Sequence, residues 1–251
     1  MAAVQCDAIR FNQLRAVLFD KDGTLADVRS FLRELGDRRA KAVDHHVPGT
    51  GEFLRRALGI SPSNVDMQGA LAVASRFENE VSAATLIAAQ GYGWSDALAI
   101  ARNAFAEVDD VLDPKAAHTP PFSDVQPCLE RLKAAGLKVG IVSADSPKFV
   151  TEFVGHYRLQ ALCPVALGST PDCLKPDPQL LWKACGRLGV RSEEVIVVGD
   201  ASSDVLLARQ GRCAGVVIVR RDAALQDVDF GADACIDTLD QLVAIAEVNK
   251  S

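Results

Sequence analysis

The stretch LRAVLFDKDGTL, residues 14–25, places the strongest constraint on the fold of this chain. Residues 16–19 form a short, continuous apolar run, which is typical of a strand buried on both faces of a parallel sheet. The run stops at Asp20-Lys21-Asp22-Gly23, so two carboxylates follow the strand directly. Open α/β sheets bind ligands at the carboxyl ends of their strands. The stretch therefore predicts a central parallel strand with a ligand site at its end.

Asp20 and Asp22 can face one site if Lys21 points away from it. Two ionised carboxylates that lie so close repel each other, so we expect a divalent cation to hold both. Gly23 allows a sharp turn and exposes backbone N–H groups, which suits a phosphate. The simpler interpretation is an acidic turn after a strand. A calcium loop is disfavoured because its glycine comes sixth, whereas here it comes fourth.

The composition excludes several classes of function. The chain has 251 residues, a formal net charge of −6 and 6% aromatic residues, with no basic run longer than a pair, which argues against a nucleic-acid partner. It has no apolar run long enough for a membrane span, and its N-terminus does not resemble a secretory signal. Seven cysteines lack C-x-x-C spacing. We therefore expect a cytoplasmic protein with reduced cysteines and no membrane partner.

The hydrophobic pattern changes twice along the chain. After a lead-in over residues 1–14 and the first strand, apolar residues at helical spacing predict four helices, the third running from Ala70 to Ala88. A proline-containing linker over 113–121 follows. Apolar runs then alternate with helical stretches, giving strands at 137–142, 163–167, 195–198, 216–219 and 234–236 and a last helix from Leu239. This pattern predicts an α/β fold with a doubly wound, Rossmann-like parallel sheet and an inserted all-helical domain. The core would comprise residues 1–25 and 119–251, and the insert residues 26–118.

Three further polar signals follow apolar runs at the predicted sheet edge. Ser143 follows LKVGIV, and its hydroxyl with nearby N–H groups could bind phosphate oxygens, although an ordinary turn serine is the simpler interpretation. Lys175 in LKPDP could be a positioned counter-ion or a surface lysine. Asp200 and Asp204 in VIVVGDASSD lie four residues apart and favour a metal site over simple helix capping by Asp200.

The order DxDGT, strand-Ser, Lys-Pro and GDxxxD resembles the four motifs of haloacid dehalogenase-like phosphatases. The resemblance covers about residues 15–25 and 120–250. The interval between Asp20 and Ser143 is long enough for the helical insert, whereas a helix and a strand already fill the interval from Ser143 to Lys175. This arrangement is similar to the subgroup with a helical cap after the first motif, to which phosphoglycolate phosphatases and β-phosphoglucomutases belong.

Two positions depart from the pattern of that subgroup. The residue after Asp20 is usually an apolar aromatic and here is Lys21, outside the acid pair. In phosphoglycolate phosphatases the residues after the second-motif Ser/Thr are often Asn-Lys, whereas Ser143 is followed by Ala144-Asp145, which leaves the substrate open. Haloacid dehalogenases proper lack the second acid of the first motif. Asp22 therefore argues against dehalogenation.

The resemblance implies a role for each motif residue. Asp20 would be the nucleophile that forms an aspartyl-phosphate, and Asp22 the general acid and base. The implied phosphate-binding residues are Gly23, Ser143, Ala144 and Lys175. The implied Mg²⁺ ligands are Asp20, Asp22 through its backbone carbonyl, Asp200 and Asp204.

These observations predict a Mg²⁺-dependent phosphatase acting on a small phosphorylated metabolite, with 2-phosphoglycolate as the leading substrate, in a monomer or homodimer. The alternatives are a β-phosphoglucomutase-like isomerase and a catalytically idle scaffold. The idle scaffold is disfavoured by the intact cluster of acids. Any of seven basic residues of the insert could meet a substrate carboxylate, although a solvated helix face is the simpler interpretation: Arg29, Arg33, Arg38, Arg39, Lys41, Arg55 and Arg56.

Overall fold

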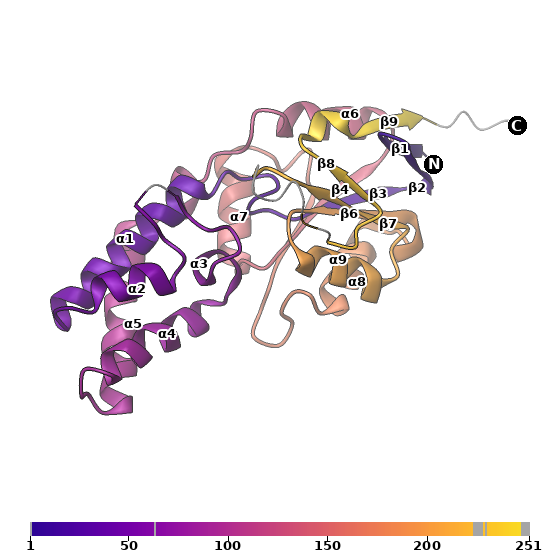
Figure 1. The fold of residues 1–251 in the computed structure, drawn as a ribbon. Helices are drawn as coiled ribbons and strands as arrows, with labels where there is room; N and C mark the ends of the chain where they lie inside the picture. The colour runs from indigo at the N-terminus through magenta and orange to yellow at the C-terminus, as the bar shows by residue number, and fades with distance from the viewer. Residues whose placement is uncertain (1, 63, 223–227, 229, 247–251) are drawn as a thin grey trace, which may run out of the picture. The chain divides into compact units, whose positions relative to one another are not determined.

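The computed structural model describes residues 2–62, 64–222, 228 and 230–246. The chain divides into two compact units, Met1–Asp27 with Pro120–Ser251 and Val28–Thr119 (Figure 1). Each unit contains its own cluster of buried apolar side chains. Among the described residues, every helix falls short of the length and apolarity needed to cross a membrane.

A six-stranded parallel sheet forms the centre of the first unit, with the strand order β5-β4-β3-β6-β7-β8. The strands are β3 (Ala16–Phe19), β4 (Lys138–Ser143), β5 (Val165–Gly168), β6 (Val195–Gly199), β7 (Gly215–Val219) and β8 (Ala234–Ile236). All four residues of β3 are buried, as expected for a strand with a neighbour on each side and helices above and below. In register, Phe19 is paired with Ile141 of β4 and with Val198 of β6. The ends of these three strands therefore lie together.

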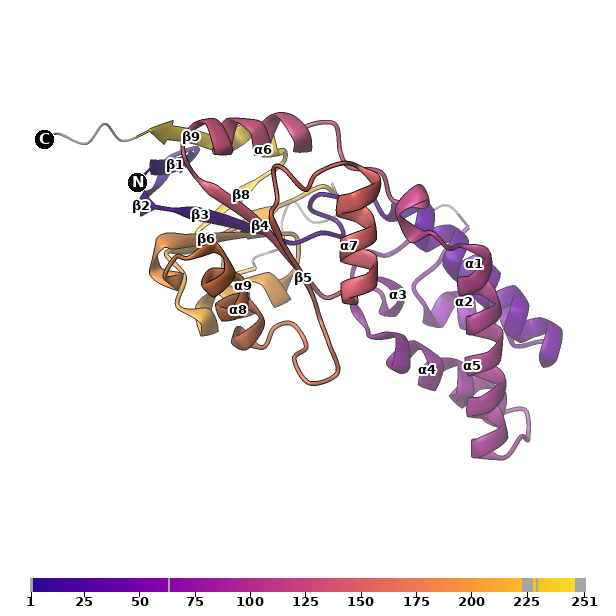
Figure 2. The same ribbon diagram turned by 180° about the vertical axis from the view of Figure 1, so that it is seen from behind.

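Helices cover both faces of this sheet. They are α6 (Val125–Ala134), α7 (Pro147–His156), α8 (Pro178–Leu188) and α9 (Ser202–Gly211). Figures 1 and 2 show α6 on one side of the sheet and α8 with α9 on the other. The apolar faces of α8 and α9 join β3 to β7 in one buried cluster. The doubly wound, Rossmann-like α/β fold predicted from the sequence is thus confirmed.

Both ends of the described chain contribute to a second, antiparallel sheet, with the order β2-β1-β9. Its strands are β1 (Ala2–Cys6), β2 (Ile9–Leu14) and β9 (Val243–Ala246). The interpretation of residues 1–14 as a lead-in before the first strand was wrong. The prediction of a last helix from Leu239 was wrong for the described residues, which form the short 3-10 turn Leu239–Gln241 and then β9. The end of that predicted helix, residues 247–251, lies outside the described residues. The β1–β2 turn uses Asp7 at a positive φ of 49° instead of a glycine, and β9 is fixed by pairing with β1. Neither cause is visible in the local hydrophobic pattern.

The second unit is helical. It comprises α1 (Arg29–His46), α2 (Gly51–Ala57), α3 (Ala70–Val73), α4 (Arg76–Ala88), α5 (Trp94–Val111) and the 3-10 turn Lys115–His118. The single helix predicted from Ala70 to Ala88 is broken between α3 and α4. Ser75 caps α4, since its Oγ accepts from the Glu78 N–H (3.2 Å) and the Glu78 carboxylate accepts from the Ser75 N–H (2.7 Å). This reciprocal capping box begins a new helix at Arg76, although the apolar residues continue at helical spacing across the break.

Candidate active site

The candidate site lies at the carboxyl ends of β3, β4 and β6. Asp20 follows β3 directly, and its backbone N–H donates to the Val198 carbonyl of β6 (2.8 Å). Asp200 follows β6, and Asp204 lies in the first turn of α9. One carboxylate oxygen from each of these three residues lies within 4.8 Å of the other two. The structure therefore brings together three of the four acids expected from the sequence to hold a metal, and the fourth, Asp22, was expected to contribute its backbone carbonyl.

Lys175 lies inside this cluster of acids. Its Nζ pairs with Asp20 Oδ1 at 2.6 Å and with Asp204 Oδ1 at 2.5 Å, and its side chain is only 2% exposed. The Lys175 ammonium is thus a buried counter-ion of the cluster and not a surface charge.

Burial dominates the electrostatics of these groups. Burial raises the pKa of Asp20 to about 7, with Lys175 opposing the shift and Asp204 adding to it. Burial also raises the pKa of Asp200 well above its usual range, and the charges of Asp20 and Asp204 raise it further. For Lys175, burial alone would lower the pKa, but the two carboxylates outweigh it and raise the pKa. One ammonium therefore faces three carboxylates, and this excess of oxygen donors and negative charge fits a divalent cation.

Two glycines allow the acids to approach the backbone this closely. A Cβ on Gly23, where φ is +80°, would lie 1.9 Å from Asp200 Oδ2, and a Cβ on Gly199 would lie 2.0 Å from Asp204 Cγ. Both glycines therefore make room for a carboxylate. The Gly23 N–H donates to the Ala26 carbonyl (3.0 Å), so among the backbone N–H groups around Gly23 that were expected to bind phosphate, its own already has an acceptor.

Ser143 is the last residue of β4 and is 1% exposed. Its Oγ accepts a hydrogen bond from the Asp145 N–H (3.1 Å), and Ala144 between them is exposed. Ser169, which the sequence analysis did not single out, connects this turn to Lys175. Its hydroxyl donates to the Ser143 carbonyl (3.1 Å) and accepts from the Lys175 N–H (3.0 Å). The sequence contains a signal that could have identified Ser169, because it directly follows the apolar strand β5 just as Ser143 ends β4.

Lys21 differs most from its expected position. Its side chain is 1% exposed, and its ammonium forms ion pairs with the carboxylates of Asp22 and Asp145, the second at 2.9 Å. The expectation that Lys21 points away from the acid pair was therefore wrong for Asp22. No local sequence pattern connects residue 21 with residue 145.

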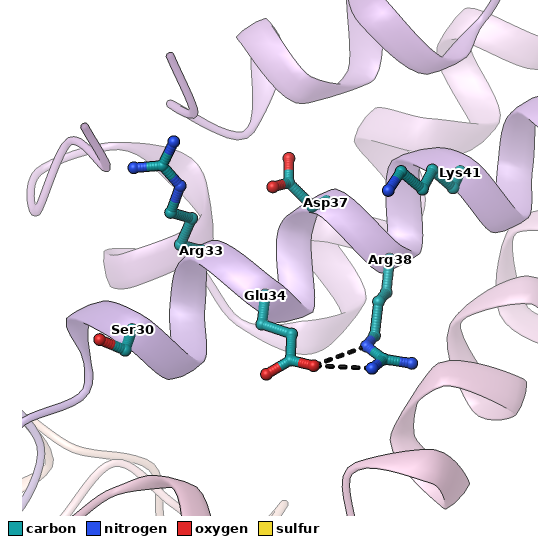
Figure 3. Close-up of a pocket in the computed structure, with 6 residues that line it drawn as sticks. All are labelled: Ser30, Arg33, Glu34, Asp37, Arg38 and Lys41. Atoms are coloured by element: carbon teal, nitrogen blue, oxygen red, sulfur yellow. Dashed lines mark hydrogen bonds and ion pairs between the residues drawn. The ribbon is translucent and has the colours of Figure 1, made fainter. Parts of the chain in front are cut away.

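Several basic residues of the helical unit pair with acids of the same unit. Arg38 Nε and Nη2 both donate to Glu34 Oε1 (2.9 and 2.7 Å), as Figure 3 shows, and Arg55 Nε pairs with Asp37 Oδ1 at 2.8 Å. Arg39 is 6% exposed and pairs with Asp109 at 2.9 Å. A shallow pocket on α1 is lined by side chains of both charges: Ser30, Arg33, Glu34, Asp37, Arg38 and Lys41 (Figure 3). Since its acids already pair with arginines, the pocket gives no separate reason to assign a ligand to α1.

Solved structures resemble this fold over most of the chain. A protein from Bacteroides fragilis, provisionally described as a haloacid dehalogenase-like hydrolase, matches with a TM-score of 0.63 and 24% identity over 91% of this chain and 99% of its own. A haloacid dehalogenase-superfamily hydrolase of subfamily IA from Geobacter sulfurreducens matches with a TM-score of 0.59 and 17% identity, over 90% and 93% of the two chains. At these identities the likeness shows the fold.

Curated relatives are similar in sequence as well. The phosphoglycolate phosphatase of Yersinia pestis is 26% identical over 212 residues, which cover 82% of this chain and 81% of the relative. That of Colwellia psychrerythraea is 25% identical over 249 residues, covering 94% and 98%. Both of these relatives carry the name of a phosphatase. The model of the haloacid dehalogenase-like hydrolase family matches residues 14–212, and the chain therefore belongs to this family of hydrolases.

Proposed function

We propose that this chain is a Mg²⁺-dependent phosphomonoesterase that hydrolyses a small phosphorylated metabolite through an aspartyl-phosphate on Asp20. The observation that supports this most is the buried Asp20 carboxylate, paired with Lys175 at 2.6 Å and clustered with Asp200 and Asp204. A buried cluster of like charges is costly for the fold, and such clusters are found where chemistry needs them. We name 2-phosphoglycolate as the first candidate substrate because the two relatives described above carry that activity in their names.

In the proposed reaction, Asp20 attacks phosphorus in line. An O–P bond forms to the Asp20 carboxylate as the bond to the ester oxygen breaks, and Asp22 gives its proton to the departing alcohol. Asp22, now ionised, takes a proton from a water molecule that attacks the aspartyl-phosphate. This second step releases inorganic phosphate, regenerates the Asp20 carboxylate and returns the proton to Asp22.

The remaining motif residues hold the phosphoryl group. Lys175 offers a buried ammonium beside Asp20, and the Ser143 hydroxyl and the Ala144 N–H supply neutral donors at the end of β4. Mg²⁺ would be held by the carboxylates of Asp20 and Asp200, the backbone carbonyl of Asp22 and, directly or through water, Asp204. When bound, it supplies positive charge that reduces the repulsion between the nucleophile and the phosphate dianion.

The helical residues 26–118 form the cap in this proposal. A cap selects a substrate by contacting the leaving group and excluding water from it. Arg38, Arg39 and Arg55 are already paired with acids of their own unit, so their charge is partly compensated before any substrate binds. These arginines therefore do not by themselves identify the substrate, and the specificity of the cap has to be measured with a series of phosphate esters.

The test is phosphate release from 2-phosphoglycolate, sugar phosphates and nucleotides, with Mg²⁺ and with EDTA. We expect metal-dependent turnover that is strongest with 2-phosphoglycolate, and its loss in Asp20→Asn. Asp240→Asn, the same change at a side chain that is 64% exposed, is the matched control and should keep full activity. Full activity in Asp20→Asn would refute the mechanism. Turnover that appears only with an added sugar bisphosphate would favour the isomerase.

A further inference from the structure

Lys21 is a lysine in the interior of the first unit. Its side chain is 1% exposed, and its ammonium contacts the Asp22 carboxylate and lies 2.9 Å from Asp145 Oδ2. The ammonium also lies 5.5 Å from the centre of the Phe153 ring. One partner, Asp22, is its neighbour in the sequence, whereas Asp145 in the turn after β4 and Phe153 in the following helix α7 belong to a distant segment. Tertiary structure thus adds the second carboxylate and the aromatic ring to a local ion pair.

The two carboxylates that contact Lys21 are more exposed than the ammonium itself. The Asp22 side chain is 30% exposed and that of Asp145 is 18% exposed. A buried ammonium is costly unless its charge is paired, so Lys21 is held in place by these acids. Because it is almost fully covered, Lys21 cannot reach a bound ester. Any effect of Lys21 on the reaction therefore passes through the two acids that it contacts, and of these Asp22 is the one with a chemical step in the proposed reaction.

We propose that Lys21 is a positioning residue for Asp22 and that Asp145 anchors it in that role. The inference rests on the proposed function, in which Asp22 protonates the leaving alcohol. The geometry repeats an arrangement found at the nucleophile, where Lys175 lies between Asp20 and Asp204. Each of the two reacting acids thus has its own buried ammonium, which in turn contacts a second acid.

The consequence of this arrangement is a restricted orientation of the Asp22 carboxylate. A proton is transferred efficiently only when the donor oxygen is held within hydrogen-bond reach of the leaving oxygen. Without Lys21, the partly exposed Asp22 carboxylate loses the ion pair that orients it. The loss should therefore affect the step that needs a proton and leave phosphoryl transfer to a good leaving group nearly intact.

The experiment compares kcat/KM for two esters with the full-length chain and Mg²⁺. The alcohol of 2-phosphoglycolate needs a proton to leave, whereas p-nitrophenolate leaves without one. We expect Lys21→Met to lower kcat/KM about 100-fold for 2-phosphoglycolate and only a fewfold for p-nitrophenyl phosphate, because general acid catalysis contributes on this scale. Asp22→Asn should show the same selectivity. Lys138→Met, at the opposite end of β4, is the matched control, since its Nζ contacts only the Leu188 carbonyl among the contacts described and it should keep both activities.

Equal losses with both esters in Lys21→Met, or no loss, would overturn the inference, since a purely structural role does not distinguish leaving groups. If Lys21→Met does not fold, the double variant Lys21→Met/Asp145→Asn also removes the charge of the second acid that Lys21 contacts, and it should show the same selectivity in a folded chain. Its absence there would also overturn the inference. A wild-type chain that cleaves neither ester, or an active Asp20→Asn, would instead refute the proposed function on which the inference rests.

Discussion

At the scale of single residues, Gly23 and Gly136 have nearly the same backbone but different surroundings. Their φ angles are +80° and +82°, yet a Cβ on Gly23 would lie 1.9 Å from Asp200 Oδ2, whereas a Cβ on Gly136 would meet nothing within 4 Å. A side chain at either position has the energetic cost of a positive φ, but only a side chain at Gly23 also has to displace a carboxylate. The second cost belongs to the candidate site.

We predict that Gly23→Ala abolishes metal-dependent phosphate release, because the added methyl group displaces Asp200. Gly136→Ala should keep that activity and lower the free energy of unfolding by only about 1 kcal/mol, the usual cost of a side chain at a positive φ. Urea unfolding and phosphate release, measured on both variants, check this. Wild-type activity in Gly23→Ala would contradict the need for close contact between this turn and Asp200.

The residues of the candidate site differ in how far they could be predicted from the sequence. Asp20 and Asp200 each follow an apolar run, and parallel strands end at one edge, so their approach follows from a local signal. The contact of Lys21 with Asp145 joins two turns that are distant in the sequence, and no local pattern reports it. Long-range ion pairs of this kind become visible only when the strand order is known.

At the scale of secondary-structure elements, Asp124 connects segments that are far apart in the sequence. It lies at the N-terminus of α6 and forms a two-point ion pair with Arg221, after β7, at 2.6 and 2.9 Å. It also accepts from the Leu239 N–H (2.8 Å), while Arg221 donates to the Thr24 carbonyl of the first motif (3.0 Å). Burial alone would raise the pKa of Asp124, but the hydrogen bonds from Arg221 and Leu239 outweigh it and hold the pKa below its usual range.

The direction of this shift predicts a pH dependence of stability. A carboxylate whose pKa is lower in the folded state stabilises the fold fully above its unfolded pKa, close to 3.8 for Asp124, and this contribution is lost as the pH falls through the folded pKa. Asp124→Asn should therefore lower the free energy of unfolding by about 3 kcal/mol at neutral pH, since it removes the buried carboxylate that pairs with Arg221. The difference from wild type should shrink below pH about 4.

Urea unfolding of both proteins between pH 3 and pH 7 checks this prediction. The matched control is Asp240→Asn, because Asp240 pairs with Arg131 at 3.1 Å while 64% exposed. Such a surface pair contributes about 0.5 kcal/mol, so this variant should differ little from wild type at any pH. A loss in Asp124→Asn that stays constant down to pH 3 would show that its ion pair is not the source of the stability.

Secondary-structure elements were predicted well where the sequence has a short continuous apolar run. They were predicted poorly where pairing with a strand distant in the sequence determines the structure. The bounds of β3 and β8 agree with the sequence analysis, because short apolar runs in a parallel sheet have few other interpretations. The segment of β9 has apolar residues at spacings that suit a helix, but pairing with β1, including Ala3 with Ile245, makes it a strand. The break between α3 and α4 was readable, because Ser75 and Glu78 have the capping-box spacing.

At the scale of the whole molecule, the chain leaves the first unit for the helical unit and returns to it at neighbouring positions. The Asp27 N–H donates to the Pro120 carbonyl (2.7 Å), and the Phe122 N–H donates to the Leu25 carbonyl (3.0 Å). Among the described residues, the two buried apolar clusters named above do not share a residue: the first draws on the sheet with α8 and α9, and the second on residues 31–112. The first unit thus has its own core and closely spaced ends where the insert begins and stops.

We predict that replacing residues 28–119 with Gly-Ser-Gly leaves a chain that folds, because the linker closes a gap already bridged by hydrogen bonds and removes no residue of the first core. Circular dichroism and a single cooperative urea transition check the fold. The excised chain should retain Mg²⁺-dependent hydrolysis of p-nitrophenyl phosphate, because the carboxylate cluster lies wholly in the first unit. It should lose its preference among alkyl esters, since the proposed cap is gone.

The same excision carrying Asp20→Asn is the control, and it should fold equally well without hydrolysing the aryl ester. Two outcomes would contradict different parts of the argument. An excised chain that does not unfold cooperatively would mean that the first core depends on the helical unit for its stability. An excised chain that folds, hydrolyses the aryl ester and still prefers 2-phosphoglycolate would mean that substrate selection lies at the strand ends, where Ala144 and Asp145 follow Ser143, and not in the helices.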